Sequence, residues 1–447
     1  MKSPILQALM ARFAQRPMDL GLARMRRALA IAQQPDHGLR IVLVAGTNGK
    51  GTTASLLSHL LREGGVERVG LFTSPHLVDV RERFRLDGQW APLPTVESVA
   101  GAALAVFSDL HRDAPELAQR GLDTAAQWGW ELTTAPRPML TFFELTTLIA
   151  LVLFKQHDVT VAVLEVGLGG RLDAVNATEP ELTLITPIGY DHQAWLGNTL
   201  TAIAREKAGT LRHGRPALIA PGPAEAVEAI MEEAVRVGAQ AHVITPPDEA
   251  LLPPWLRGTF AVNAGLALAA AHRLGVDNTT VQQLDHYRWP GRRDRVRLGD
   301  GPLEGAWWLD GAHNPDGAQA LVEAVLALAP QERPRCGVIG VMEGKDVDAL
   351  GAALAPLPVT WWTTQLPPDW PSRGASWRAQ PLAERLREVG LTVQASCEAV
   401  GEALMDVRRY VGHPDEPVLV CGSLYVMGAV VHQLGAPDAF FDLHQRG

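Results

Sequence analysis

The feature that most constrains the fold is a set of apolar runs that are continuous instead of alternating. The runs are IVLVAG, VTVAVLEVG and ELTLITPIG before residue 190, and AWWLDG, RCGVIGVM, VTWWTT and PVLVCGS after residue 305. Most are followed by a glycine-rich or polar turn and then by a helical pattern. Continuous runs are typical of parallel strands that helices cover on both faces. The sequence therefore predicts an α/β fold in each half of the chain.

The length and one charged segment predict two domains. At 447 residues the chain exceeds one typical hydrophobic core, since domains commonly hold about 100 to 200 residues. The two sets of runs are separated by DHYRWPGRRDRVRLGDGPLEG, which is rich in Pro, Gly and charge. We predict an N-terminal nucleotide-binding domain at residues 1–291, with a mostly parallel sheet flanked by helices. A smaller, Rossmann-like α/β domain is predicted at residues 292–447.

The composition excludes several partners and compartments. A formal net charge of −9 argues against nucleic acid or an anionic membrane surface as a partner. The N-terminal segment lacks a sustained apolar core, so we expect no signal peptide. The most apolar stretch, at 145–154, is too short to span a bilayer and predicts a buried helix. Three widely spaced cysteines suit neither a disulfide framework nor a zinc site, and we expect a cytoplasmic protein.

A glycine-rich segment, GTNGKGTT at 46–53, lies between a strand-like run and leucines at helical spacing. This order aims backbone N–H groups and the positive end of a helix at an anion. Lys50 would then lie by the terminal phosphates, and the hydroxyl of Thr52 or Thr53 by a magnesium ion. The spacing departs from the commonest phosphate loop, because Val44 takes the place of its first glycine and Gly51 that of its final Ser or Thr. A tight structural turn is the alternative.

Polar residues follow two further predicted strands. Glu165 lies at the carboxyl end of the strand predicted at 159–166, and His192 follows the one predicted at 182–188. Open parallel sheets place their ligands at this edge. A carboxylate, an imidazole and hydroxyl groups are an acceptable set for magnesium that is held mainly by phosphate and water. The alternative for His192 is a solvent-facing turn residue.

Further motifs follow in order along nearly the whole chain. They are TSPHL (73–77), FFE (142–144), LEVGLGGRLDAVN (164–176), DH (191–192), REKAG (205–209), WPGR (289–292), LDGAHNP (309–315) and GSLY (422–425). With the glycine-rich segment, this set resembles the folylpolyglutamate synthase and dihydrofolate synthase family of the Mur ligase superfamily. The resemblance implies an ATP-dependent ligase that joins L-glutamate to dihydropteroate, and to the γ-carboxylate of reduced folates, through an acyl phosphate.

The resemblance also implies roles for residues that match the motifs. The implied ATP contacts are Gly46, Thr47, Asn48, Gly49, Lys50, Gly51, Thr52, Thr53, Asn263, Arg292, Asp310 and His313. The implied metal ligands are Thr52, Ser74, Glu165 and His192, and the implied substrate contacts are Phe143, Arg171 and Asp173. Catalytic roles fall to Lys50, His192, Lys207 and Arg292. Spacing alone does not separate Arg292 from Arg293, and Phe143 could equally be a core residue.

Lys207 lies in TAIAREKAG, a predicted helix with Thr201 as its N-cap and Gly209 as its end. An exposed helical lysine is the plain interpretation. The resemblance implies instead a lysine carbamate formed from carbon dioxide, and that reaction requires a neutral amine and hence a lowered pKa. The implied cofactors are thus ATP, Mg²⁺ and carbamylated Lys207. A monovalent cation such as K⁺ is compatible with the sequence.

Other functions are less compatible with the motifs. A Mur-type cell-wall amino-acid ligase acting on a UDP-linked substrate is the sister interpretation. A nucleotide-binding switch or a small-molecule kinase would explain 46–53 but leave LDGAHNP without a purpose. We expect small-molecule substrates and a monomer. Trp307, Trp308, Trp361 and Trp362 lie in strand patterns and are expected to be packing residues.

Overall fold

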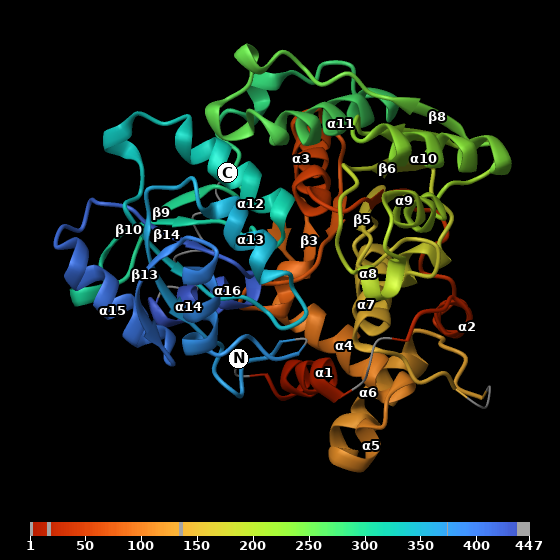
Figure 1. Cartoon of the computed structure of the whole chain (residues 1–447). Helices are drawn as coiled ribbons and strands as arrows, with labels where there is room; N and C mark the ends of the chain where they lie inside the picture. Colours follow the sequence, from red (N-terminus) through yellow and green to blue (C-terminus); the bar gives the residue numbers. More distant parts are fainter. Residues whose placement is uncertain (1–2, 16–18, 134–136, 373, 436–447) are drawn as a thin grey trace. The chain divides into compact units, whose positions relative to one another are not determined.

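Figure 1 shows a computed structural model that describes residues 3–15, 19–133, 137–372 and 374–435. The chain forms two compact units. Unit 1 comprises Met1–Pro75, Asp79–Leu251 and Ala261–Asp285, and unit 2 comprises His76–Val78, Leu252–Phe260 and His286–Gly447. Independent domains at 1–291 and 292–447 stay a prediction.

Unit 1 is built on an eight-stranded sheet with the order β4-β3-β2-β5-β1-β6-β7-β8. All neighbours from β2 to β8 in this order are parallel, and only β3 and β4 add antiparallel pairs at one edge. The strands are β1 (Arg40–Ala45), β2 (Val69–Phe72), β3 (Phe84–Leu86), β4 (Gln89–Trp90), β5 (Val161–Glu165), β6 (Leu182–Ile185), β7 (Pro216–Ile219) and β8 (Gln240–Val243).

Helices of unit 1 connect and cover these strands. Helix α3 packs on the central strands β1, β2 and β5, and α4 packs against α6 and α7. The α-helices are α1 (Pro4–Gln15), α2 (Ala23–Ile31), α3 (Lys50–Glu63), α4 (Leu93–Phe107), α5 (Leu110–Asp113), α6 (Pro115–Gln127), α7 (Phe142–Gln156), α8 (Gln193–Leu196), α9 (Leu200–Ala208), α10 (Ala224–Val237) and α11 (Thr259–Arg273), whose first two residues belong to unit 2. The 3₁₀ turns are η1 (Val80–Arg83), η2 (Ala174–Ala177), η3 (Glu249–Leu251) and η5 (Val281–Leu284).

Unit 2 contains a six-stranded sheet with the order β13-β12-β11-β14-β10-β9. Only β9 is antiparallel to its neighbour. The strands are β9 (Asp294–Leu298), β10 (Gly305–Leu309), β11 (Cys336–Ile339), β12 (Thr360–Thr364), β13 (Thr392–Cys397) and β14 (Val418–Cys421). The helices are α12 (Pro315–Leu326), α13 (Val347–Leu354), α14 (Ala379–Glu388), α15 (Val400–Val411) and α16 (Leu424–Gln433), with 3₁₀ turns η4 (Pro254–Leu256), η6 (Gly301–Leu303) and η7 (Pro330–Glu332).

The four tryptophans that were expected to be packing residues lie in strands of unit 2 and are buried, as predicted. Trp361 belongs to the apolar cluster beneath α12, α13 and α14, whereas its neighbour Trp362 meets Tyr410 of α15 edge to face. This alternation follows from the period of two along a strand. Trp307 and Trp308 are also buried. The α/β fold predicted for each half is therefore confirmed.

The apolar stretch at 145–154 forms the middle of α7, and all of its residues are buried. Among the helices of the described ranges, none combines the length and apolar character needed to cross a membrane. Cys336, Cys397 and Cys421 are buried free thiols.

Candidate functional site

The glycine-rich segment leaves β1 and enters α3 through a turn that requires glycine. Gly46 and Gly49 have φ values of 135° and 85°, which L-residues with a side chain rarely adopt. A Cβ at Gly46 would collide with the hydroxyl of Thr186, and one at Gly49 with the amide oxygen of Asn263. Both glycines are therefore fixed by conformation and by close neighbours.

This turn is anchored to the loop that follows β6. The Thr47 hydroxyl donates to Gly189 O and accepts from Gly189 N–H, both at 3.1 Å, and Thr47 N–H donates to Pro187 O at 3.1 Å. Lys50 Nζ donates to Thr47 O at 2.9 Å, at the start of the helix. The turn therefore has the rigid, amide-lined form of an anion site at a helix N-terminus.

Asn263 of α11 lies against the same turn. It is buried, and its Oδ1 accepts a long hydrogen bond of 3.4 Å from the Thr53 hydroxyl. The structure thus brings together the implied nucleotide contacts of unit 1, at 46–53 and 263, although more than 200 residues separate them in sequence.

Three candidate metal ligands lie beside the first turn of α3. Glu165 ends β5, is buried, and accepts from Ser74 N–H at 2.8 Å through Oε2. A Cβ at Gly51 would lie 3.3 Å from that same oxygen, so carboxylate and helix start are adjacent. The hydroxyl of Thr52 is buried and has no hydrogen-bond partner among the residues that the structure describes. An orphaned hydroxyl near a carboxylate fits a hard cation with oxygen ligands.

His192 lies on the neighbouring loop, after β6. It has a left-handed backbone with φ 53° and is the N-cap residue of α8. Its side chain is 46% exposed and lies 3.7 Å from the Asp191 carboxylate. Within the described part of the chain, no three His, Cys, Asp or Glu side chains are grouped to hold a metal by themselves. A metal at this edge would therefore depend on hydroxyl and ligand oxygens as well.

Lys207 is buried, so the interpretation as an exposed helical lysine is wrong. Its Nζ donates to Gly46 O of the phosphate-loop turn at 2.7 Å. Burial, followed by the charge of Lys50, lowers the pKa of the Lys207 amine to about 7. The predicted N-cap at Thr201 is also wrong, because Thr199 caps α9 by accepting from Ala202 N–H at 3.1 Å.

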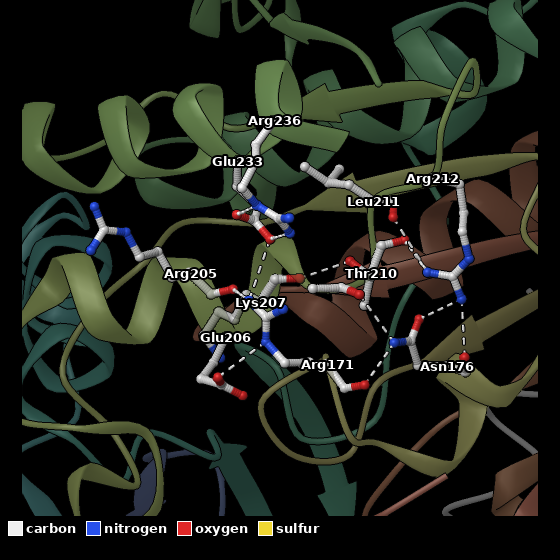
Figure 2. Close-up of polar contacts among 11 residues, drawn as sticks. Arg171, Asn176, Arg205, Glu206, Lys207, Thr210, Leu211, Arg212, Glu233 and Arg236 are labelled. Carbon is white, nitrogen blue, oxygen red and sulfur yellow. Dashed lines mark hydrogen bonds and ion pairs between the residues drawn. The ribbon is translucent and has the colours of Figure 1, made fainter. Parts of the chain in front are cut away.

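The loop after β5 is held firmly by its own polar side chains. Asp173 is buried, and its two carboxylate oxygens accept from Leu168 N–H at 2.9 Å and Val175 N–H at 3.1 Å. Arg171 donates to Arg205 O at 3.0 Å and to Glu206 at 3.3 Å (Figure 2). The side chains of Arg171 and Asp173, which the resemblance implies as substrate contacts, are therefore engaged within the protein, and Arg171 ties this loop to α9.

Phe143 lies at the start of α7 and is half-buried. Its ring contacts Phe72 with centroids 5.8 Å apart. A Cβ at Gly167 would approach that ring to 2.6 Å, so the loop after β5 passes directly over it. Phe143 therefore forms an aromatic wall beside this loop.

In unit 2, three of the implied residues gather at the carboxyl end of β10. Asp310 accepts from Arg293 N–H at 2.9 Å and Ala312 N–H at 2.8 Å, and burial raises the pKa of its carboxyl against the charge of Arg292. His313 Nδ1 lies 2.7 Å from Gly311 O. The Arg292 guanidinium lies against Gly311, where a Cβ would collide with it.

The two adjacent arginines, which spacing could not separate, have different environments. Arg293 is buried, donates to Arg257 O at 2.8 Å and Ala320 O at 2.9 Å, and stacks on Phe260 at 4.1 Å. It holds the short segment 252–260 within unit 2. Arg292 lies instead with Asp310 and Gly311, which favours it as the nucleotide contact.

Sequence reasoning missed two residues beside Lys207. Asn176 and Arg212 join the loop after β5 to the end of α9 through several hydrogen bonds. Asn176 ends the quoted motif LEVGLGGRLDAVN, and Arg212 follows REKAG by a few residues. Only their burial and partners, which sequence does not contain, distinguish them from ordinary loop residues.

The comparisons with known proteins agree with one another. A family model described as the dihydrofolate synthetase C-terminal domain matches residues 302–433. The chain is 32% identical over 439 residues to the dihydrofolate synthase/folylpolyglutamate synthase of Escherichia coli, covering 94% of this chain and 92% of that protein. Relatives from Haloferax volcanii and Halobacterium salinarum, named probable bifunctional folylpolyglutamate synthase/dihydropteroate synthase, are longer, and this chain spans about half of their length, 48% and 46%.

Solved structures have the same architecture. Escherichia coli FolC in complex with DHPP and ADP gives a TM-score of 0.77 at 28% identity, covering 97% of this chain and 98% of that one. The bifunctional folylpolyglutamate synthase/dihydrofolate synthase of Yersinia pestis, complexed with AMPPNP and a Mn ion, gives 0.74 at 28% identity, with 97% and 98% covered.

Proposed function

The chain belongs to the folylpolyglutamate synthase and dihydrofolate synthase family, and we propose on this basis that it is an ATP-dependent ligase that forms amide bonds with L-glutamate. The observation that carries the proposal is the turn at 46–49. It presents glycine amides and Lys50 at a helix start, with the orphaned hydroxyl of Thr52 and the carboxylate of Glu165 beside it. The proposed acceptors are dihydropteroate and the γ-carboxylate of reduced folates, which the relative's name, dihydrofolate synthase/folylpolyglutamate synthase, supports.

A carboxylate and a protonated amine do not condense in water, because oxide is a poor leaving group and the amine lone pair is occupied. In the proposed route an oxygen of the acceptor carboxylate attacks the γ-phosphorus of ATP, and ADP leaves. The amine of glutamate then attacks the acyl phosphate carbon, the C–O bond to phosphate breaks, and the amine loses a proton. The products are an amide, ADP and phosphate.

Residues of this chain have defined tasks in that route. Residues 46–53 bind the phosphates through amide N–H groups, and Lys50 counters the charge that spreads over the γ-phosphoryl group. Asn263 is proposed as a further nucleotide contact, which its position beside Gly49 supports. Arg292, Asp310 and His313 of unit 2 are proposed as further nucleotide contacts, because Arg292 lies with Asp310 and not in the buried setting of Arg293.

The Mn ion of the Yersinia pestis structure supports a divalent ion as cofactor. Thr52, Ser74, Glu165 and His192 are the residues that we propose would hold it. When bound, magnesium neutralises phosphate charge and lowers the barrier to phosphoryl transfer. The buried hydroxyl of Thr52 and the carboxylate of Glu165 fit such an ion.

We also propose that Lys207 is carbamylated. Its neutral amine would attack carbon dioxide, form an N–C bond and release a proton, which turns a buried cation into an anion. Burial of the side chain and the lowered pKa of the amine support this step. Phe143 would form an aromatic wall for the pterin ring. Arg171 and Asp173 would position the acceptor by fixing the loop after β5.

The proposed partners are small molecules only, namely the acceptor, L-glutamate and ATP, and the proposed state is a monomer in the cytoplasm. The buried thiols of Cys336, Cys397 and Cys421 suit a reducing compartment.

The deciding experiment measures ADP release from purified protein with ATP, L-glutamate and one acceptor at a time. We expect release with dihydropteroate or a reduced folate that falls to background when glutamate is omitted. Lys50→Met should reduce release at least about 100-fold, because removing charge stabilisation in phosphoryl transfer has effects of this size. Release with a UDP-muramyl acceptor alone would replace this proposal with the cell-wall ligase.

A further inference from the structure

A buried asparagine joins the loop after β5 to the end of α9. Asn176 is 3% exposed and uses all of its side-chain hydrogen-bonding groups (Figure 2). Its Nδ2 donates to Arg171 O at 2.9 Å and to Gly209 O at 3.1 Å, and its Oδ1 accepts from Arg212 Nη2 at 3.0 Å. No other residue type of this size offers two donors and an acceptor in that arrangement.

Arg212 completes the same junction from the other side. Its Nη2 also donates to Asn176 O at 3.0 Å and Thr178 O at 3.1 Å, and its Nη1 donates to Thr210 O at 3.2 Å and Leu211 O at 3.4 Å. One planar guanidinium thus satisfies carbonyl groups from both segments, which a lysine ammonium could not do.

The backbones at this junction are in close contact. Arg171 N–H donates to Glu206 O at 2.9 Å. A Cβ at Gly170 would come within 2.8 Å of Glu206 O, and one at Gly209 would collide with Arg171. The backbone of the loop therefore packs directly against the last turn of α9, and there is no space for one segment to shift along the other.

That last turn carries Lys207. The Thr210 hydroxyl donates to Lys207 O at 2.8 Å, and Lys207 Nζ donates to Gly46 O at 2.7 Å. Because Lys207 is two residues from Gly209, a shift of the junction moves the lysine relative to the phosphate loop. Displacements of about 1 Å are enough to slow catalysis by about 100-fold.

We propose that Asn176 and Arg212 are positioning residues for the ligase reaction. They hold the last turn of α9 against the loop after β5, and this keeps the Lys207 side chain in position against Gly46 of the phosphate loop. They touch neither nucleotide nor acceptor and act through Lys207. This inference rests on the proposed function, because turnover is its readout.

The test uses two substitutions that keep size or charge. In Asn176→Asp, a carboxylate oxygen replaces the Nδ2 donor and faces the carbonyls of Arg171 and Gly209, while the contact with Arg212 is kept. In Arg212→Lys, the positive charge is kept, but the planar set of guanidinium donors is lost. The matched control is Arg205→Gln on the same helix, because the Arg205 side chain forms an exposed ion pair with Glu232.

We expect kcat for glutamate-dependent ADP release to fall about 10- to 100-fold in both variants, with KM for ATP within about threefold of wild type. Arg205→Gln should match wild type within about twofold. Thermal unfolding measured in parallel shows that the assayed variants are folded. If Asn176→Asp does not fold, Arg212→Lys decides alone.

Folded variants with wild-type kcat would contradict the positioning role of Asn176 and Arg212. So would a rise in KM for ATP at unchanged kcat, because the residues would then affect binding and not alignment. An inactive wild-type protein would instead refute the proposed function, so the two failures are distinguishable.

Discussion

At the scale of single residues, Lys207 shows how burial changes chemistry. Its amine has a pKa of about 7 where the ordinary value is 10.5, because burial and Lys50 disfavour the cation. Between these pH values the unfolded chain binds more protons than the folded protein, so the free energy of unfolding rises with pH. Below pH 7 the Lys207 amine is protonated in both the folded and the unfolded state. The folded protein then carries the full free-energy cost of burying this cation.

We therefore expect Lys207→Met to raise the free energy of unfolding most below pH 7. The gain is at most about 5 kcal/mol and shrinks as the pH rises toward 10, since the buried amine is then neutral in the wild type. Urea unfolding at a series of pH values, in buffer free of carbon dioxide, metal and nucleotide, measures the difference.

The matched control is Lys155→Met, which removes an exposed lysine that donates to His37 O at 3.3 Å. Its effect on the free energy of unfolding should stay within about 0.5 kcal/mol at each pH. A stability difference for Lys207→Met that does not change with pH would show that the amine is not destabilised by burial.

At the scale of elements, two glycines that flank helix α3 have the same φ and different neighbours. Gly49 precedes the helix and Gly65 follows it, and both have φ 85°. A Cβ at Gly49 would collide with Asn263, whereas one at Gly65 would meet no atom of the described residues within 4 Å. The pair therefore separates backbone strain from crowding at the phosphate loop.

Gly65→Ala should lower the free energy of unfolding by about 1 kcal/mol, the usual strain of a left-handed residue with a side chain. Gly49→Ala should lower it by about 2 to 4 kcal/mol and weaken ADP binding at least tenfold, because Asn263 or the helix start must move. Urea unfolding and calorimetric titration measure both effects. Equal losses in the two variants would mean that Asn263 does not restrict the turn.

The sequence predicts where helices and strands form, but not which side chains make contacts between them. The run at 159–166 corresponds to β5, and the leucines at helical spacing after GTNGKGTT lie in α3, because apolar periodicity is a local signal. The N-cap of α9 was misplaced, since Thr199 and Thr201 are equally good caps by sequence. Burial of Lys207 and the junction at Asn176 arise from contacts between distant segments, which local patterns do not encode.

At the scale of the whole molecule, two α/β units each place charged residues at the carboxyl ends of their strands. Glu165 and the phosphate-loop turn lie there in unit 1, and Asp310 lies there in unit 2. Parallel sheets bind ligands at this edge because helix N-termini and loop amides converge on it. Two such edges in one chain suit a reaction that must bind a nucleotide, an acid and an amine.

The central step of the proposed reaction is activation of the acceptor carboxylate as an acyl phosphate. The most direct measurement follows oxygen from dihydropteroate labelled with ¹⁸O in its carboxylate, in a reaction with ATP and L-glutamate. When the amine expels phosphate, the bridging oxygen leaves with it, so each inorganic phosphate formed should carry one ¹⁸O atom, seen by mass spectrometry or ³¹P NMR. Unlabelled phosphate formed alongside the amide would contradict the account.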